Sequence, residues 1–278
     1  MTTTVTLTGT GTPRPAPGRA GAGVLVQHHD ESIQIDAGRA TAMRLAEAGL
    51  ACNRLDALFL THHHSDHVIG VPDLLISRWV MGATEPLVVV APDGPLTEFG
   101  GHVLDLWAED LRIRQEHTGR APMPAPAWRA FDATGRPTVV WEGRKVRVSS
   151  VLVQHQPVEP AVAYRVDTDA GTSVVVSGDT RVCDGVSQLA HGADVLVHEV
   201  VRPALLGKQR GYIGEYHAEA VALGALAAEA RVARLVLTHL EPAPTTPEDE
   251  AAFEKDVREG GFTGEVVVGQ DLSRVVIQ

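Results

Sequence analysis

Short runs of apolar residues, rich in valine and leucine, recur along the whole chain and predict buried β-strands. Residues 23–27 and 32–36 are close enough in sequence to form a hairpin. Residues 5–8 alternate between apolar and polar side chains, as in a strand with one buried face. The remaining predicted strands are residues 55–60, 86–90, 146–153, 161–166, 173–177, 194–197, 234–238, 265–268 and 274–277.

A second spacing, with apolar side chains three to four positions apart, predicts helices between several of these strands. Residues 41–50 and 74–79 are of this kind, and residues 219–230 form an alanine-rich segment of high helix propensity. Strands that alternate with helices indicate an α/β fold. Because the chain has no close repeat and no separate linker, we expect one domain, residues 1–278, in which two similar α/β halves share a sandwich of sheets.

Residues 99–136 interrupt this alternation. Within them, residues 104–113 have a helical pattern, whereas residues 121–126 contain three prolines and cannot form regular structure. The segment also contains Trp107 and Trp128. Two interpretations stay open for this insertion: a lid over a pocket, and a surface excursion or contact between subunits, which leaves a homodimer open.

The length and composition are those of a large globular domain. The 278 residues can bury a sizeable core, and the apolar fraction of 44% and charged fraction of 21% are ordinary. The sequence predicts no membrane-spanning helix and no secretory signal. Cys52 and Cys183 are too few to indicate a disulfide framework. We therefore expect a cytoplasmic protein without a membrane partner.

The chain is acidic, with 24 lysines and arginines against 35 aspartates and glutamates and a formal net charge of −11. Such a field repels polyanions, although a local basic patch can still bind them. The charge therefore disfavours a nucleic-acid substrate without excluding it.

Four histidines and an aspartate follow the predicted strand 55–60. Because alternate residues of an extended segment share a face, His62 and His64 can hold one cation together. Asp66 and His67 lie around the following turn and can face a second cation. The alternative, an exposed histidine tract that binds metal weakly, fits less well with a position directly after a buried strand.

Other predicted strands also end in metal-binding residues, namely His155, Asp179 and His239. Taken alone, each could be a hydrogen-bonded polar residue at a strand end. Together, they indicate an active site built from loops at one edge of an α/β core. Imidazoles and carboxylates without thiolates suit zinc, with manganese and iron as alternatives. Seven ligands are too many for one tetrahedral ion, but they fit two ions that share a carboxylate.

The sequence resembles the metallo-β-lactamase superfamily, and within it the branch that holds ribonuclease Z, arylsulfatase-type and phosphodiesterase-type enzymes. The stretches that carry this resemblance are residues 7–13, 61–67, 155, 163–164, 177–180, 198–199, 216–217 and 237–239. The resemblance spans nearly the whole chain and implies a four-layer αββα sandwich with its active site at one edge. It also implies one metal on His62, His64 and His155, a second on Asp66, His67 and His239, and Asp179 as the bridge.

The resemblance also implies a catalytic role for three residues. Asp66 would orient or deprotonate a metal-activated water. His217 would donate a proton or stabilise an oxyanion, oriented by Glu199; the alternative is a histidine at a helix start that binds nothing. His63 points away from its neighbours in an extended tract and is expected to be structural. No role is expected for His28, His29, His102, His117 and His191.

A small-residue loop at residues 9–13 contains two glycines. It lacks the third glycine of a dinucleotide-binding fingerprint and includes Pro13, which excludes that function. A loop beside the reactive centre and a simple turn stay open.

We expect a dinuclear metallo-hydrolase of an ester bond, with a small phosphodiester or sulfate ester as substrate. Ribonuclease Z enzymes usually carry a tRNA-clasping arm between the equivalents of His155 and Asp179, but only 24 residues separate these positions here. This favours a small molecule over tRNA 3′ processing. A lactone, thioester or amide hydrolase is an alternative. A flavin-linked di-iron oxidoreductase is disfavoured by His64 and by the chain length, and a non-catalytic scaffold by the complete ligand set.

Overall fold

The apolar runs form two mixed β-sheets that lie face to face in a computed structural model, which describes residues 2–278. The first sheet contains, in spatial order, β14 (Arg274–Ile277), β1 (Thr3–Gly9), β2 (Gly23–His28), β3 (Glu31–Ile35), β4 (Ala57–Phe59), β5 (Val88–Pro92) and β6 (Ala127–Phe131). The second contains β13 (Glu265–Val268), β12 (Arg234–Glu241), β11 (Val195–Val201), β10 (Ser173–Val176), β9 (Val162–Thr168), β8 (Val146–Leu152) and β7 (Thr138–Glu142).

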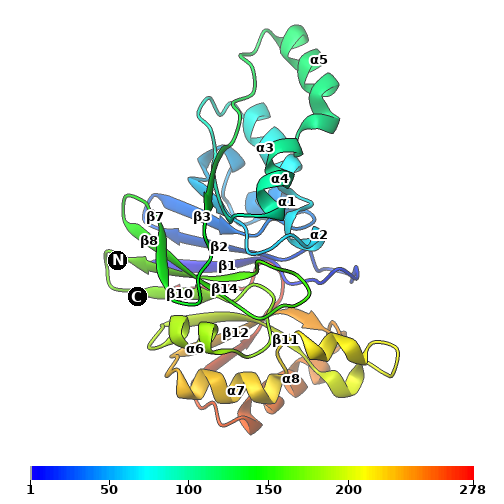
Figure 1. Cartoon of the computed structure of the whole chain (residues 1–278), viewed down its shortest axis with the longest axis vertical. Helices are drawn as coiled ribbons and strands as arrows, with labels where there is room; N and C mark the ends of the chain where they lie inside the picture. The colour runs from blue at the N-terminus through cyan, green and yellow to red at the C-terminus, as the bar shows by residue number, and fades with distance from the viewer. Residues whose placement is uncertain (1) are drawn as a thin grey trace.

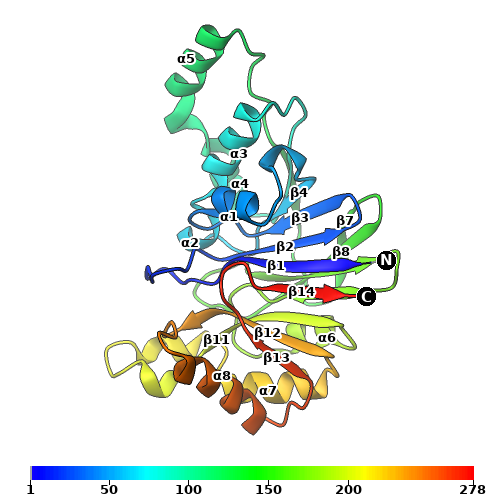
Figure 2. The same ribbon diagram turned by 180° about the vertical axis from the view of Figure 1, so that it is seen from behind.

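Helices cover the outer face of each sheet (Figures 1 and 2). On the side of the first sheet are α1 (Thr41–Glu47), η1 (Cys52–Arg54), α2 (Ser65–Val68), α3 (Val71–Val80), α4 (Pro95–His102), η2 (Asp105–Trp107) and α5 (Ala108–Thr118). On the side of the second are α6 (Asp184–Ala190), η3 (Pro203–Leu205), η4 (Gly211–Glu215), α7 (Ala220–Glu229) and α8 (Pro247–Glu259). The predicted four-layer αββα sandwich is thus confirmed.

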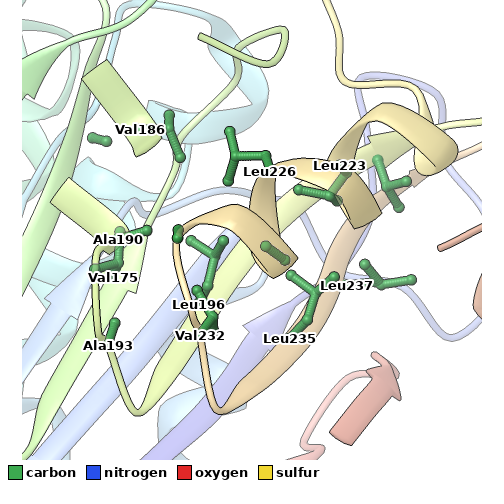
Figure 3. Close-up of a cluster of buried hydrophobic side chains, with 14 of the residues drawn as sticks. Val175, Val186, Ala190, Ala193, Leu196, Leu223, Leu226, Val232, Leu235 and Leu237 are labelled. Carbon is green, nitrogen blue, oxygen red and sulfur yellow. The ribbon is translucent and has the colours of Figure 1, made fainter. Parts of the chain in front are cut away.

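Successive side chains of the central strands enter different core layers, because side chains of a strand point alternately to its two faces. In β10, Val174 and Val176 lie between the sheets, whereas Val175 faces α6 and α7. Figure 3 shows Val175 in this outer layer with Leu196 and Leu223. Both faces of these strands are buried, which explains why the sequence reads as continuous apolar runs rather than as alternation.

Two hydrogen bonds join the sheets at the end of β4. Tyr164 of β9 is fully buried, and its hydroxyl donates to the carbonyl oxygen of Leu60 at 2.7 Å. The backbone nitrogen of Val162 donates to the carbonyl oxygen of Thr61 at 3.1 Å. The backbone at the start of the histidine tract is therefore fixed by hydrogen bonds between the two sheets.

The interval 99–136 contains regular structure that the sequence did not predict. Strand β6 pairs in parallel with β5 at the edge of the first sheet. It is half-exposed and contains Arg129 between apolar residues, so it forms no continuous apolar run. Helix α5 protrudes from the body and buries none of its residues (Figure 1). A lid function for this segment stays a prediction.

The apolar pattern also missed other elements, among them α2, α4, α6, β7 and α8. Helix α8 is rich in charged residues and buries only Phe253 and Val257. Its start is nevertheless marked in the sequence by a capping box, in which Thr246 and Asp249 satisfy each other's backbone nitrogens. Cys52 and Cys183 are both free and buried, as expected from their isolation. Within residues 2–278, no helix has the length and apolar character needed to cross a membrane.

Replacing Tyr164 with phenylalanine should destabilise the protein by about 1–3 kcal/mol, because it leaves the buried Leu60 carbonyl without its donor. Denaturant unfolding measures this cost. The exposed Tyr212 provides a matched control, since Tyr212→Phe should change the free energy of unfolding by less than about 0.5 kcal/mol. Equal effects of the two substitutions would show that the inter-sheet hydrogen bond does not stabilise the fold.

Candidate metal centre

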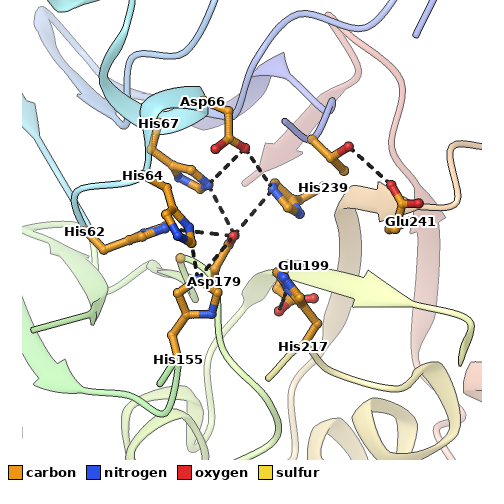
Figure 4. A network of polar contacts seen from close by, with 12 residues as sticks. His62, His64, Asp66, His67, His155, Asp179, Glu199, His217, His239 and Glu241 are labelled. Atoms are coloured by element: carbon orange, nitrogen blue, oxygen red, sulfur yellow. Dashed lines mark hydrogen bonds and ion pairs between the residues drawn. The ribbon is translucent and has the colours of Figure 1, made fainter. Parts of the chain in front are cut away.

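The carboxyl ends of strands from both sheets meet at one edge of the sandwich, and the predicted ligands lie there (Figure 4). Strand β4 leads to the histidine tract, β8 to His155, β10 to Asp179, and β12 carries His239 near its end. Except for the half-exposed His64, the seven predicted ligands are buried. The fold thus brings all seven together.

One group of ligand atoms comprises His62, His64, His155 and Asp179, all within 4.8 Å of one another. His155 Nε2 lies 3.2 Å from His64 Nδ1 and 3.8 Å from Asp179 Oδ2. His62 Nε2 lies 3.9 Å from the same Asp179 oxygen.

A second group comprises Asp66, His67 and His239. His239 Nε2 lies 3.2 Å from Asp66 Oδ2 and 3.4 Å from Asp179 Oδ2. His67 Nε2 lies 3.3 Å from Asp179 Oδ1. Asp179 therefore faces both groups, which is the position of a bridging ligand.

These separations suit a small divalent cation. Two ligand atoms that are each about 2.0–2.1 Å from a tetrahedral ion lie about 3.3 Å apart. The atom pairs of both groups, at 3.2–3.9 Å, are close to that value. The donors are nitrogen and carboxylate oxygen, which suit zinc but also iron and manganese.

Unpaired buried atoms provide an independent test of this fit. His62 Nε2, His67 Nε2, Asp66 Oδ1 and Asp179 Oδ1 are buried and make no hydrogen bond within the described chain. Such atoms are costly to bury unless something satisfies them. The four atoms named here converge on one centre, and each belongs to a predicted ligand. The residues present therefore fit a pair of divalent cations.

The charges of the centre separate the two groups of histidines. Burial lowers the pKa of His62, His64 and His155, so these imidazoles are neutral at pH 7 and ready to bind a cation.

Burial also opposes protonation of His67 and His239, but the carboxylates of Asp179 and Asp66 outweigh it and raise the pKa of both imidazoles. The pKa of Asp179 is held well below its usual range, because its histidine neighbours outweigh the effect of burial. Since a histidine ligand must be deprotonated, metal binding releases protons here and weakens as the pH falls.

Asp36, at the end of β3, orients the second group and was not among the predicted site residues. Its carboxylate accepts hydrogen bonds from His67 Nδ1 at 2.7 Å and from the backbone nitrogen and hydroxyl of Thr61, each at 2.8 Å. This bond leaves His67 Nε2 to face the metal centre, as outer carboxylates do for histidine ligands. The sequence did contain a signal, because Asp36 ends a predicted strand as several of the candidate ligands do.

The backbone is also adjusted to the site. His239 lies at an irregularity in the pairing of β11 with β12 and has a φ of 45°. Asp36 has a φ of 58°. Left-handed conformations are unfavourable for residues other than glycine, and they concentrate at functional sites. Here they turn the side chains of His239 and Asp36 toward the centre at the strand ends.

His217 and Glu199 lie beside the ligands, as Figure 4 shows. His217 Nδ1 is 2.7 Å from Glu199 Oε1, an oxygen that also accepts a hydrogen bond from the backbone nitrogen of Thr180. Burial opposes protonation of His217, but Glu199 outweighs it and raises the pKa to about 9. His217 also lies within 4.8 Å of Asp179 and His239 by their ligand atoms. Its other nitrogen is thus positioned to act at the centre.

Two other predicted features lie at or near the centre. His63 is exposed and its ring contacts Phe99 rather than the ligands, as expected from an extended tract. The glycine loop approaches the end of β12: the hydroxyl of Thr12 donates to Glu241 at 3.2 Å, and the carbonyl of Thr10 accepts from Leu240. The loop therefore lies against the residues that follow His239.

The sandwich and its edge of imidazoles and carboxylates define a metallo-hydrolase of the metallo-β-lactamase fold. The chain belongs to the family described as Anti-Pycsar protein Apyc1, whose sequence model matches residues 3–262. It is also 38% identical to the Ribonuclease Z of Mycobacterium avium (strain 104) over 264 residues, which cover 92% of each chain.

Solved structures share the fold. The metallo-β-lactamase fold protein YhfI from Bacillus subtilis superposes with a TM-score of 0.76 at 23% identity, covering 99% of this chain and 100% of that one. Human tRNase Z, short form, gives a TM-score of 0.69 at 23% identity and covers 98% of each chain. The resemblance inferred from the sequence is confirmed.

His64 and His63 offer a matched pair of substitutions to test the ligand assignment. The wild type should bind two divalent ions per chain, His64→Ala about one, and His63→Ala two, because only His64 belongs to the ligand cluster. Elemental analysis of metal-loaded, gel-filtered protein measures the content. Retention of two ions by His64→Ala, or loss of one by His63→Ala, would refute the assignment.

Proposed function

We propose that the protein is a dinuclear metal-dependent hydrolase of a phosphodiester, and that its substrate is a small molecule. The observation that carries the proposal is the position of Asp179 between two groups of ligand atoms. One group is His62, His64 and His155, and the other is Asp66, His67 and His239. Two bound cations would supply a water of lowered pKa and neutralise charge on the phosphoryl oxygens.

Asp66 is the residue to position the attacking water. Its Oδ2 faces His239 and His67, whereas its Oδ1 is buried and makes no hydrogen bond within residues 2–278. Neighbouring imidazoles outweigh burial and lower the pKa of Asp66, so the carboxylate is ionised and can accept a hydrogen bond from the water. The same group would thus ligate and orient.

His217 is the proposed general acid. Glu199 fixes its ring through Nδ1 and favours its protonated form. Glu199 is itself fixed, because it accepts from the backbone nitrogens of Thr180 and Ala218. A proton held at His217 Nε2 could then pass to the leaving oxygen of the ester.

Two observations support a small substrate. The interval between His155 and Asp179 is filled by β9, β10 and their connections, so it contains no protruding arm. The net charge of −11 opposes the approach of a long polyanion. A sulfate ester is similar to a phosphodiester in charge and geometry, so sulfate esters should be tested beside phosphodiesters.

A second candidate is cleavage of RNA, which the relatives named Ribonuclease Z favour. Because the matched region covers 92% of each chain, those relatives are close to this chain in length. The short interval between His155 and Asp179, which leaves no room for an arm, argues against this candidate. A lactone, thioester or amide hydrolase on the same centre is a third candidate.

A substrate panel separates these functions. We expect the metal-loaded protein to hydrolyse chromogenic phosphodiesters, with slower or no turnover of sulfate-ester, lactone and thioester chromogens and of a tRNA precursor. Asp179→Ala should abolish turnover because it removes the shared ligand, whereas His63→Ala should retain it. Preferential cleavage of the tRNA precursor would establish the second candidate, and preferential lactone or thioester hydrolysis the third.

His217→Ala should lower kcat about 100- to 10,000-fold, the usual range for loss of a general acid. Because the acid must be protonated, kcat of the wild type should fall as the pH rises through the pKa of His217, which gives the pH profile an alkaline limb. Two bound cations would lower this pKa, so the limb should lie below about 9. Glu199→Gln removes the carboxylate that favours protonated His217, so it should move the alkaline limb to lower pH. Profiles of kcat against pH measure both effects.

An alkaline limb that persists unchanged in His217→Ala would exclude His217 as its origin. Metal analysis of the same variant provides the control, because loss of an ion would identify His217 as a ligand instead.

A further inference from the structure

Residues 10–22 connect β1 to β2 and lie between the named strands. Outside a ladder of backbone hydrogen bonds, the position of such a loop depends on contacts from other segments. Both ends of this loop contact one side chain, that of Asp271 in the turn before β14. Strand β14 pairs with β1, and Figure 2 shows the two side by side. The turn near the C-terminus is therefore placed to hold the loop.

The carboxylate of Asp271 accepts four hydrogen bonds. Its Oδ1 accepts from the backbone nitrogen of Thr10 at 2.9 Å and from the hydroxyl of Thr10 at 2.8 Å. Its Oδ2 accepts from the backbone nitrogen of Ala20 at 2.6 Å and from Nε of Arg44 at 2.9 Å. The side chain of Asp271 is only 5% exposed. Hydrogen bonds to a carboxylate are stronger than those between neutral groups, so Asp271 joins the two ends of the loop firmly.

Arg19 reinforces this connection from within the loop. Its guanidinium donates to the hydroxyl of Thr10 at 2.7 Å and to the carbonyl oxygen of Gly269 at 3.0 Å. The backbone nitrogen of Gly11 also donates to the carbonyl oxygen of Ala20 at 2.8 Å, which closes the loop on itself. The loop is thus fixed both internally and against the turn before β14.

The two ends of the loop contact the segments that carry the second group of ligands. The carbonyl oxygen of Thr10 accepts a hydrogen bond from the backbone nitrogen of Leu240, the residue after His239. At the other end, Gly21 packs against the backbone of Asp66. A Cβ atom at Gly21 would lie only 2.9 Å from the carbonyl oxygen of Asp66, so this approach requires glycine. The position of the loop therefore affects the backbone at both ligands.

The first group of ligands is held differently. Within residues 2–278, no hydrogen bond joins the loop to His62, His64 or His155. The start of the histidine tract is fixed instead at Thr61, by Asp36 and by the hydrogen bond between the sheets. A displacement of the loop should therefore disturb one group of ligands and leave the other in place.

We propose that Asp271 is a positioning residue for the second metal ion, because it holds the loop that fixes the backbone at Asp66 and His239. This inference rests on the proposed two-metal centre. Asp271 is not a ligand and acts only through the loop. Residues that orient metal ligands typically contribute about 10- to 100-fold to metal affinity, and the effect of Asp271 should be confined to one of the two ions.

The test measures the zinc affinity of each group of ligands separately, by competition with a chromogenic chelator. His64→Ala disrupts the first group and Asp66→Ala the second, so each variant should bind one ion. Asp271→Asn keeps the size of the side chain but removes its charge and one acceptor oxygen. In the His64→Ala background it should raise the Kd for zinc about 10- to 100-fold. In the Asp66→Ala background it should leave the Kd unchanged.

Asp194→Asn is the control for a general loss of stability. The carboxylate of Asp194 accepts from the backbone nitrogen of Ser173 at 2.8 Å and from its hydroxyl at 3.1 Å, at the end of β11 opposite the metal centre. This substitution should leave both Kd values unchanged. Thr10→Val is a milder second variant, because it removes one hydrogen bond to Asp271 and keeps the others. It should raise the Kd in the His64→Ala background by a smaller factor, and it replaces Asp271→Asn if that variant does not fold.

Equal weakening of zinc binding in both backgrounds would overturn the proposal, and so would an unchanged Kd in the His64→Ala background. Selective weakening by Asp194→Asn would also overturn it, since any loss of stability would then have the same effect. If neither background binds zinc, the two-metal centre fails and the proposal fails with it. Binding of one ion by each background, with no effect of Asp271→Asn, would refute only the positioning role.

Discussion

The burial of three carboxylates at the meeting point of two sheets is the constraint on which the rest of the site depends. Asp36, Asp66 and Asp179 are each at most 4% exposed. Ionised groups are tolerated in such surroundings only when they are paired or bound to metal. Imidazoles from the ends of β4, β8 and β12 surround these carboxylates. The centre is therefore a concentrated negative site that binds cations, whether protons or metal ions.

The two-sheet architecture makes this concentration possible. Each sheet contributes ligands at the carboxyl ends of its strands, so neither half of the chain forms the centre alone. His67 and Asp66 follow β4 of the first sheet, whereas Asp179 follows β10 and His239 lies in β12 of the second. The buried Tyr164 hydroxyl holds the sheets together one residue before the histidine tract begins. Core packing and ligand geometry are thus coupled at the same point.

The sequence predicted the architecture well because both faces of the central strands are buried and leave long apolar runs. It failed where that signal is weak, as in the half-exposed edge strand β6 and the charged helix α8. The candidate metal ligands could be named from the sequence because they follow recognisable strands. Asp36 ends such a strand too, but its task of orienting His67 depends on a contact between residues 31 positions apart.

The residues around the ligands were harder to predict for a similar reason. Glu199 was expected to orient His217, and the structure provides the contact at 2.7 Å. Tyr216 precedes His217 in one of the stretches that carried the resemblance, but no contact could be assigned to it, because the sequence of the loop between β11 and α7 does not indicate which side chains face the site. The contact of Tyr216 with His155 emerges only once the loop is folded back across the edge.

The central claim is that Asp179 bridges two metal ions held by the two groups of ligands. Anomalous X-ray diffraction from crystals of the metal-loaded protein tests it most directly. The account predicts two anomalous peaks about 3.5–4 Å apart, one beside His62, His64 and His155 and one beside Asp66, His67 and His239, with the Asp179 carboxylate between them. A single peak, or a second peak away from Asp179, would contradict the account.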